Sequence, residues 1–146
     1  HAANYPLKKF NEYINIHNLN TSKLKVLVLG LTFKGWPENN DTRGSVSVDI
    51  YNELVTSKFD VELFDFSLQK ESQNEFKLVK SLFKSISNFD AIFIMNNHPE
   101  NVTIENEIMT HNKPLFLFDG WNLINRNQIS MNKNVTYCTM GYASKK

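Results

Sequence analysis

The sequence predicts a doubly wound α/β fold, with a mainly parallel sheet of about five to six strands in three α/β/α layers. Short apolar runs without alternation, such as residues 26–29, are typical of strands buried on both faces of a parallel sheet. Segments with apolar residues at helical spacing separate these runs. The 146 residues, of which 41% are hydrophobic, are enough for one core and one domain.

The first expected elements are a helix, a strand and a second helix. Apolar residues recur at helical spacing between polar ones in residues 5–18, which predicts an amphipathic N-terminal helix. Its apolar positions are Leu7, Phe10, Ile14 and His17. The run at 26–29 predicts a strand that Gly30 ends. A polar loop follows, and residues 45–59 are expected to form the next helix.

The remaining elements alternate in the same way, and this alternation makes the expected fold Rossmann-like. Apolar runs predict the strands, and apolar residues at helical spacing predict the first of the helices. Pro99 suits the first position of a helix. The expected elements are a strand at 61–66, a helix at 76–86, a strand at 91–95, a helix at 99–111, a strand at 115–118, a short helix at 123–131 and a strand at 135–140.

The loop after the first strand carries residue types that bind phosphate. It contains the cations Lys34 and Arg43, and it leads into a helix whose N-terminus points back toward the end of the strand. Backbone N–H groups and the helix dipole at such an end favour an anion. The glycines are too widely spaced for the GxGxxG fingerprint, so the sequence excludes a dinucleotide turn of that kind.

Three motifs in the chain match a known family in order and spacing. The first is GLTFKG at residues 30–35 with DTRGS at residues 41–45, the second is NHPE at 97–100, and the third is FDGWN at 118–122. Together they resemble the C-terminal, nucleotide-sugar-binding domain of the UDP-glucose/GDP-mannose dehydrogenase family over residues 24–142.

The resemblance implies site residues at the carboxyl ends of the strands. The residues that it places against the nucleotide-sugar are Phe33, Lys34, Gly120 and Trp121. Arg43 matches an arginine near the cofactor NAD, although it could instead pair with Asp41 and brace the loop. Lys34 also has a simpler interpretation as a surface lysine. The residues expected to be structural at the site are Asp41, His98 and Asp119.

Trp121 departs from the family pattern, because the usual residue at its position is an arginine that reaches the nucleotide-sugar. An indole can donate one hydrogen bond and stack, but it cannot neutralise a phosphate. Three roles are open for Trp121: it stacks on the uracil ring, stacks on the sugar, or fills space at a domain interface.

The resemblance also implies a longer parent chain, which His1 in place of a starting Met supports. Residues 1–22 are then the end of a central helix from a missing N-terminal NAD domain, and residues 23–146 are the nucleotide-sugar-binding domain. Alternatively, the first helix simply packs on its own sheet. The expected parent is a homodimeric, NAD-dependent dehydrogenase that oxidises the primary alcohol of a UDP-sugar to a uronic acid for polysaccharide synthesis. The fragment alone is expected to be inactive.

Two rival functions belong to other classes. One is a non-catalytic nucleotide-binding or interaction module with the same fold. The other is a signalling receiver domain, since Asp65 and Asp119 also follow expected strands. A receiver needs an acidic cluster around magnesium, and Asp65 has no acidic neighbour in the sequence.

Charge and residue usage narrow the expected partners. A net charge of +1 argues against a nucleic-acid or membrane surface, which needs a strongly basic face. The single cysteine, Cys138, allows no internal disulfide and is expected to be a core thiol in a cytoplasmic protein. The histidines are scattered without carboxylate or cysteine neighbours at ligand spacing, so no metal is expected.

Overall fold

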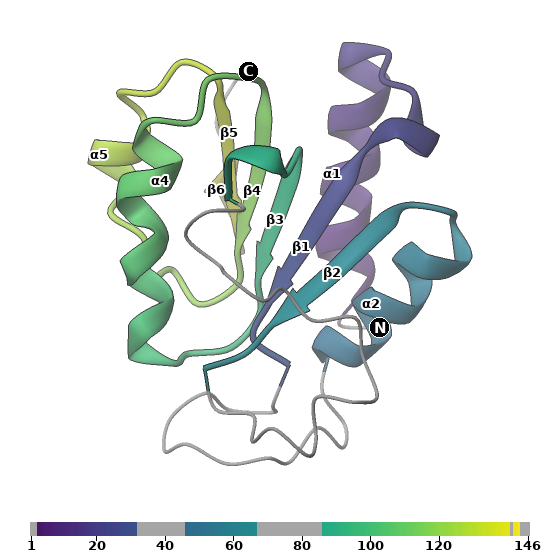
Figure 1. The fold of residues 1–146 in the computed structure, drawn as a ribbon, viewed down its shortest axis with the longest axis horizontal. Coiled ribbons are helices and arrows are strands. Elements are labelled where there is room, and N and C mark those ends of the chain that lie inside the picture. Colours follow the sequence, from purple (N-terminus) through teal and green to yellow (C-terminus); the bar gives the residue numbers. More distant parts are fainter. Residues whose placement is uncertain (1–2, 32–45, 67–85, 141, 144–146) are drawn as a thin grey trace.

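A computed structural model of the protein describes residues 3–31, 46–66, 86–140 and 142–143. Its centre is a six-stranded sheet in the order β2-β1-β3-β4-β5-β6 (Figure 1). The strands are β1 (Lys25–Leu29), β2 (Asp60–Phe64), β3 (Ala91–Ile94), β4 (Leu115–Asp119), β5 (Val135–Thr139) and β6 (Tyr142–Ala143). Strands β1 to β5 are parallel, and β6 pairs antiparallel with β5. The predicted fold class is confirmed.

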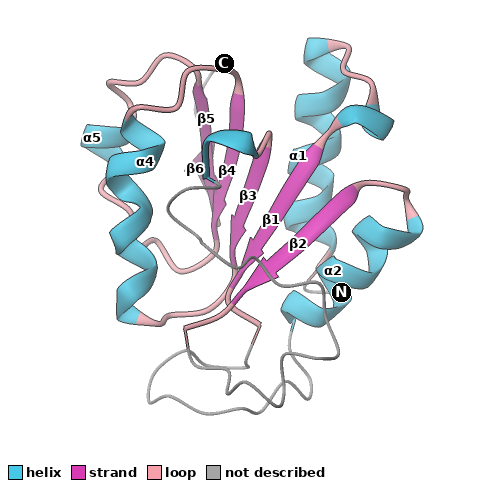
Figure 2. Ribbon diagram, viewed as in Figure 1, coloured by secondary structure: helices cyan, strands magenta, loops and turns pink. Residues whose placement is uncertain are grey.

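Helices cover both faces of this sheet, which gives three layers (Figure 2). On one face lie α1 (Asn4–His17) and α2 (Val46–Thr56). The other face is covered by η3 (Ile86–Asn88), η4 (Pro99–Ile104), α4 (Glu105–Met109) and α5 (Arg126–Ile129). A short turn of 3-10 helix, η1 (Thr21–Lys23), leads from α1 into β1.

The apolar runs form strands because each of them is buried on both sides. In β1, Val26 and Val28 join the core beneath α1 and α2, while Leu27 and Leu29 join the core beneath α4 and α5. All four side chains are fully buried. An alternating apolar and polar pattern would expose one face of the strand, so the continuous run is what this central position requires.

Helix α1 packs on the sheet of its own chain. Phe10 is 1% exposed, and its ring centroid lies 5.2 Å from that of Phe116 on β4 and 5.4 Å from that of Phe93 on β3. Tyr13 packs beside it on Phe116. In the described residues, α1 therefore packs on its own sheet, as one of the two interpretations of the first helix expects. Its continuation into a longer central helix stays a prediction.

The helices differ from expectation in three places. The helix expected at 99–111 consists of the 3-10 turns of η4 followed by the short α4. Helix α2 ends at Thr56 because Lys58, at φ 73°, turns the chain into β2. His17, predicted on the apolar face of the first helix, is exposed, and Tyr13 is buried instead. Of the helix expected at 76–86, residues 76–85 lie outside the described part.

Candidate functional site

The sheet order creates a topological switch point between β1 and β3. From β1 the chain continues to β2 on one side, and from β3 it continues to β4 on the other. In open α/β sheets, ligands bind beyond the carboxyl ends of the strands at such a point. Gly30 follows β1 there with φ 94°, and a Cβ atom on it would lie 2.5 Å from Cγ of Asn96, which follows β3. Only glycine allows this close approach.

Buried polar side chains connect the ends of the strands at this point. The Asp65 carboxylate, after β2, accepts hydrogen bonds from the Leu31 N–H and from Nδ2 of Asn96, the second at 3.2 Å. Asn101 Nδ2 donates to the Asn96 backbone carbonyl and to Asn96 Oδ1, both at 2.9 Å. Asp65 is 6% exposed, and both asparagines are fully buried. This network fixes how the chain leaves β1, β2 and β3.

His98 lies at the start of η4, beside the same network. Its Nδ1 accepts a hydrogen bond of 3.1 Å from the Glu100 N–H, which caps the first turn of η4. Its ring stacks on that of Phe66, with centroids 5.4 Å apart and an angle of 26° between the planes. These contacts hold the turn that precedes Pro99, so His98 has the surroundings that a structural role needs.

Asp119 ends β4 and holds the turn that carries Gly120 and Trp121. It is fully buried, and its carboxylate accepts hydrogen bonds from the Ile124 N–H at 2.8 Å, the Tyr137 hydroxyl at 2.9 Å and the Trp121 N–H at 3.3 Å. Burial raises the pKa of Tyr137, and the neighbouring Asp119 carboxylate raises it further. Tyr137 therefore remains a neutral donor to this carboxylate.

Gly120 and Trp121 lie where β3 and β4 end side by side. A Cβ atom on Gly120 would lie 2.9 Å from the Ile94 carbonyl oxygen, which accepts a 2.8 Å hydrogen bond from the Gly120 N–H. The indole Nε1 of Trp121 donates to the Met95 carbonyl oxygen at 3.2 Å, so the ring reaches from the end of β4 to the end of β3. The Trp121 side chain is nevertheless 43% exposed.

Not every predicted site residue can be placed. Phe33, Lys34, Asp41 and Arg43 lie outside the described residues. Asn101 and Tyr137 support the carboxyl ends of the strands, but the sequence does not single them out. It indicates Asp65 only as a possible receiver acid. The position of Asp65 directly after an apolar strand was a usable signal. In the described ranges, no group of three or more His, Cys, Asp or Glu side chains is arranged to hold a metal ion.

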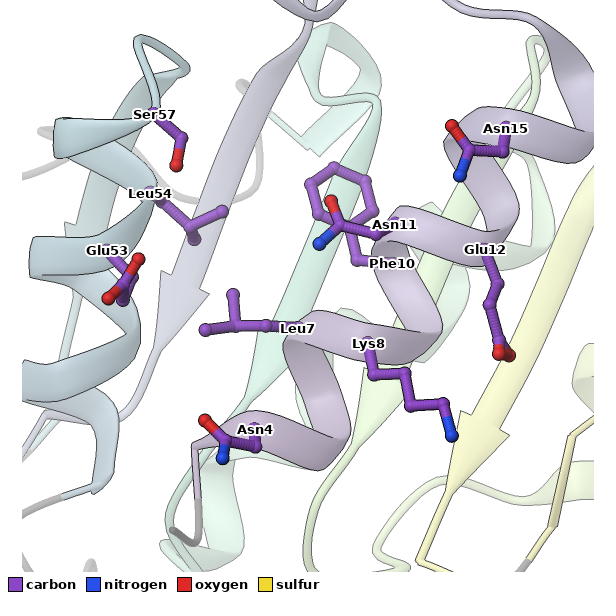
Figure 3. Close-up of a pocket in the computed structure, with 10 residues that line it drawn as sticks. All are labelled: Asn4, Leu7, Lys8, Phe10, Asn11, Glu12, Asn15, Glu53, Leu54 and Ser57. Carbon is purple, nitrogen blue, oxygen red and sulfur yellow. The ribbon is translucent and has the colours of Figure 1, made fainter.

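Away from the strand ends, a hollow of about 440 Å³ lies between α1 and the C-terminal half of α2 (Figure 3). Leu7 and Leu54 point toward each other across it. Its lining includes side chains of both charge signs, among them Lys8 and Glu53. This mixture does not favour a doubly charged anion, so the polar strand edge is the better candidate for a phosphate ligand.

The sequence profile of the UDP-glucose/GDP-mannose dehydrogenase family, UDP binding domain, matches residues 27–126 of the 146. The chain belongs to this family. The matched segment runs from β1 to the start of α5 and contains the carboxyl ends of β1, β2, β3 and β4. None of the described helices of the chain is long and apolar enough to cross a membrane.

Individual relatives agree with the family. A UDP-N-acetyl-D-mannosamine dehydrogenase of Methanococcus vannielii is 33% identical over 116 residues, which cover 77% of this chain and 26% of that protein. The UDP-D-ManNAc dehydrogenase of Pyrococcus horikoshii has a similar structure, with a TM-score of 0.73 at 22% identity over 95% of this chain and 30% of that one. The UDP-N-acetyl-mannosamine dehydrogenase Cap5O of S. aureus gives a TM-score of 0.67 at 22% identity, with coverages of 95% and 31%. The two structures show a shared fold, and the chain spans under a third of each relative.

Proposed function

We propose that this chain binds the nucleotide part of a UDP-sugar at the carboxyl edge of its sheet. The observation that carries the proposal is the family match over residues 27–126, which contains the switch point between β1 and β3. Gly30 and Gly120 let the strand ends pack closely, because a Cβ on either residue would collide with Asn96 or with the Ile94 carbonyl oxygen. The buried network around Asp65 and Asn96 holds those ends in place before any ligand arrives.

The residues that contact the ligand in this proposal are Phe33, Lys34, Gly120 and Trp121. Lys34 supplies a compact positive charge with several donors, which suits a diphosphate oxygen. Asp119 sets the turn that presents Gly120 and Trp121, and His98 sets the neighbouring turn. Asp41 is assigned to the support of the loop and Arg43 to its contact with the cofactor.

The parent enzyme in this proposal is a homodimeric, cytoplasmic nucleotide-sugar dehydrogenase of polysaccharide synthesis. It oxidises the primary alcohol of the sugar to a uronic acid, and NAD, when bound, is the hydride acceptor. The glycines of this chain do not have the spacing of a dinucleotide turn, so we assign NAD binding mainly to an N-terminal domain beyond this sequence. The chain itself binds and orients the substrate and is inactive alone.

The first sugar to test is N-acetylmannosamine, because the relatives named above are UDP-N-acetylmannosamine dehydrogenases. Calorimetric titration with UDP, GDP, UDP-N-acetylmannosamine and UDP-N-acetylglucosamine measures the nucleotide and sugar preferences together. We expect UDP and its sugars to bind more tightly than GDP.

The Lys34→Ala variant tests the place of the diphosphate. We expect it to bind UDP about tenfold more weakly, which corresponds to about 1.4 kcal/mol. The matched control is Lys23→Ala, because Lys23 is exposed and precedes β1 at the opposite edge of the sheet. Equal affinity of both variants would place the diphosphate elsewhere, and absence of UDP binding to the unchanged chain would refute the proposal.

A further inference from the structure

We propose that the indole of Trp121 is a fixed stacking platform for the uracil ring of the nucleotide. This inference rests on the proposed binding of a UDP-sugar and adds which part of the ligand Trp121 contacts. It assigns the residue a role of its own instead of that of the arginine usual at this position, because an uncharged ring cannot neutralise phosphate.

Hydrogen bonds hold the indole before any ligand arrives. The backbone N–H of Trp121 donates to Asp119 Oδ1 at 3.3 Å, and the indole Nε1–H donates to the Met95 carbonyl oxygen at 3.2 Å. Asp119 is itself held by Ile124 and Tyr137. The side chain is thus attached at both ends, to β4 through its backbone and to the end of β3 through its ring.

This attachment determines what Trp121 can offer a ligand. The indole has a single N–H donor, and the Met95 carbonyl already accepts it. What remains available is the face of the ring, on a side chain that is 43% exposed. A ring face binds planar, unsaturated groups by stacking, and a nucleobase is the planar part of a UDP-sugar.

The position of the ring also suits the base rather than the phosphates. Phosphates are expected at the switch point between β1 and β3, beyond the carboxyl ends of these strands. Strand β4 is separated from β1 by β3, so the ends of β1 and β4 are about 10 Å apart. An extended nucleotide with its diphosphate near β1 places its base over the ends of β3 and β4.

Fluorescence of Trp121 tests the contact directly. The chain has two tryptophans, so Trp36→Phe leaves Trp121 as the only tryptophan emitter. We expect UDP and uridine to change its emission in a saturable way and inorganic pyrophosphate to leave it unchanged. Calorimetry on the same variant relates the optical signal to binding. A signal from pyrophosphate equal to that from UDP would overturn the proposal.

Substitution of Trp121 tests its energetic role. We expect Trp121→Leu to weaken UDP and uridine binding about tenfold each and to leave pyrophosphate binding and the salt dependence of UDP binding unchanged. Trp121→Phe keeps a ring but loses the Met95 hydrogen bond, so we expect a smaller loss of about threefold. Val55→Ala is the control, because Val55 is an exposed apolar residue near the end of α2, at the opposite edge of the sheet.

The outcomes separate this inference from the proposed function. If the unchanged chain binds UDP and Trp121→Leu binds it equally well, or loses pyrophosphate to the same degree, the platform is wrong while UDP binding stands. If the unchanged chain binds no UDP, the proposed function fails, and the platform fails with it. A thermal melt of each variant confirms that it is folded.

Discussion

The hydroxyl of Tyr137 on β5 donates a 2.9 Å hydrogen bond to the carboxylate of Asp119 at the end of β4. Tyr137 is 3% exposed and Asp119 is fully buried, so this bond lies inside the protein. It ties the last parallel strand to the turn that presents Gly120 and Trp121. The geometry of the strand edge therefore depends on a residue that belongs to the core.

The Tyr137→Phe variant removes this bond and keeps the ring. We expect a loss of about 2 kcal/mol in the free energy of unfolding, because a buried carboxylate loses one of its donors. Denaturant titration measures the loss. Tyr5→Phe is the control, since the Tyr5 hydroxyl has no hydrogen bond within the described ranges, and a loss of similar size there would contradict the assignment.

Gly30→Ala tests the close approach at the switch point. At φ 94° an alanine is strained, and its Cβ would lie 2.5 Å from Cγ of Asn96. We expect destabilisation of at least about 2 kcal/mol together with weaker UDP binding. Lys58→Gly makes the opposite change at another positive φ, of 73°, and is expected to be neutral or slightly stabilising. A Gly30→Ala protein of unchanged stability would show that Asn96 gives way.

Phe10→Ala tests whether α1 is part of the domain. Phe10 is 1% exposed and contacts the rings of Phe93 and Phe116 on the sheet. We expect a loss of about 3–5 kcal/mol in the free energy of unfolding. Ile16→Ala, on the same helix but at a side chain that is 72% exposed, should change it by less than about 0.5 kcal/mol. Similar values for the two variants would mean that α1 detaches in solution.

The protein is expected to lose stability in alkali through its buried acids. Burial raises the pKa of Cys138 from 9.0 to about 11 and that of Tyr13 from 10.0 to about 12. Between the unfolded and folded pKa of each group, the unfolded chain releases a proton that the folded chain keeps, so stability falls as the pH rises through this window. Well below pH 9.0 both groups are protonated in both states, and stability does not depend on them. Thermal melts from pH 8 to 11 measure the slope. Cys138→Ala should make the slope shallower, and an unchanged slope would exclude the thiol as a contributor.

The strands were predictable because the apolar pattern that indicates each of them lies within its own residues. A run such as Ala91–Ile94 is apolar at every position, a pattern that is typical of a strand buried on both faces. The placement of His98, Asp119 and Trp121 beyond strand ends follows from the same pattern, since the carboxyl ends of parallel strands lie on one side of the sheet. Two-residue β6 has no pattern of its own and was not predicted as a separate strand.

The supporting residues of the edge were not predictable, because their roles arise from distant contacts. Asn101 lies in a polar stretch and looks like a surface residue in the sequence, yet it is fully buried and donates hydrogen bonds to Asn96. Tyr137 looks like an ordinary strand residue until Asp119 is placed beside it. The change from the 3-10 helix η4 to the α-helix α4 likewise has no local signal, since residues 99–111 have apolar positions that suit one α-helix.

The central position of β1 has a consequence for folding during synthesis on the ribosome. Strand β1 comes early in the chain but pairs with β3, and Lys25 N–H is bonded to Asp90, 65 residues later. During synthesis, one side of β1, which is apolar from Val26 to Leu29, stays unpaired until β3 has emerged. Such an unpaired edge is prone to associate with other chains. The aggregation of stalled, shortened chains should therefore decline sharply once residue 94 has left the exit tunnel.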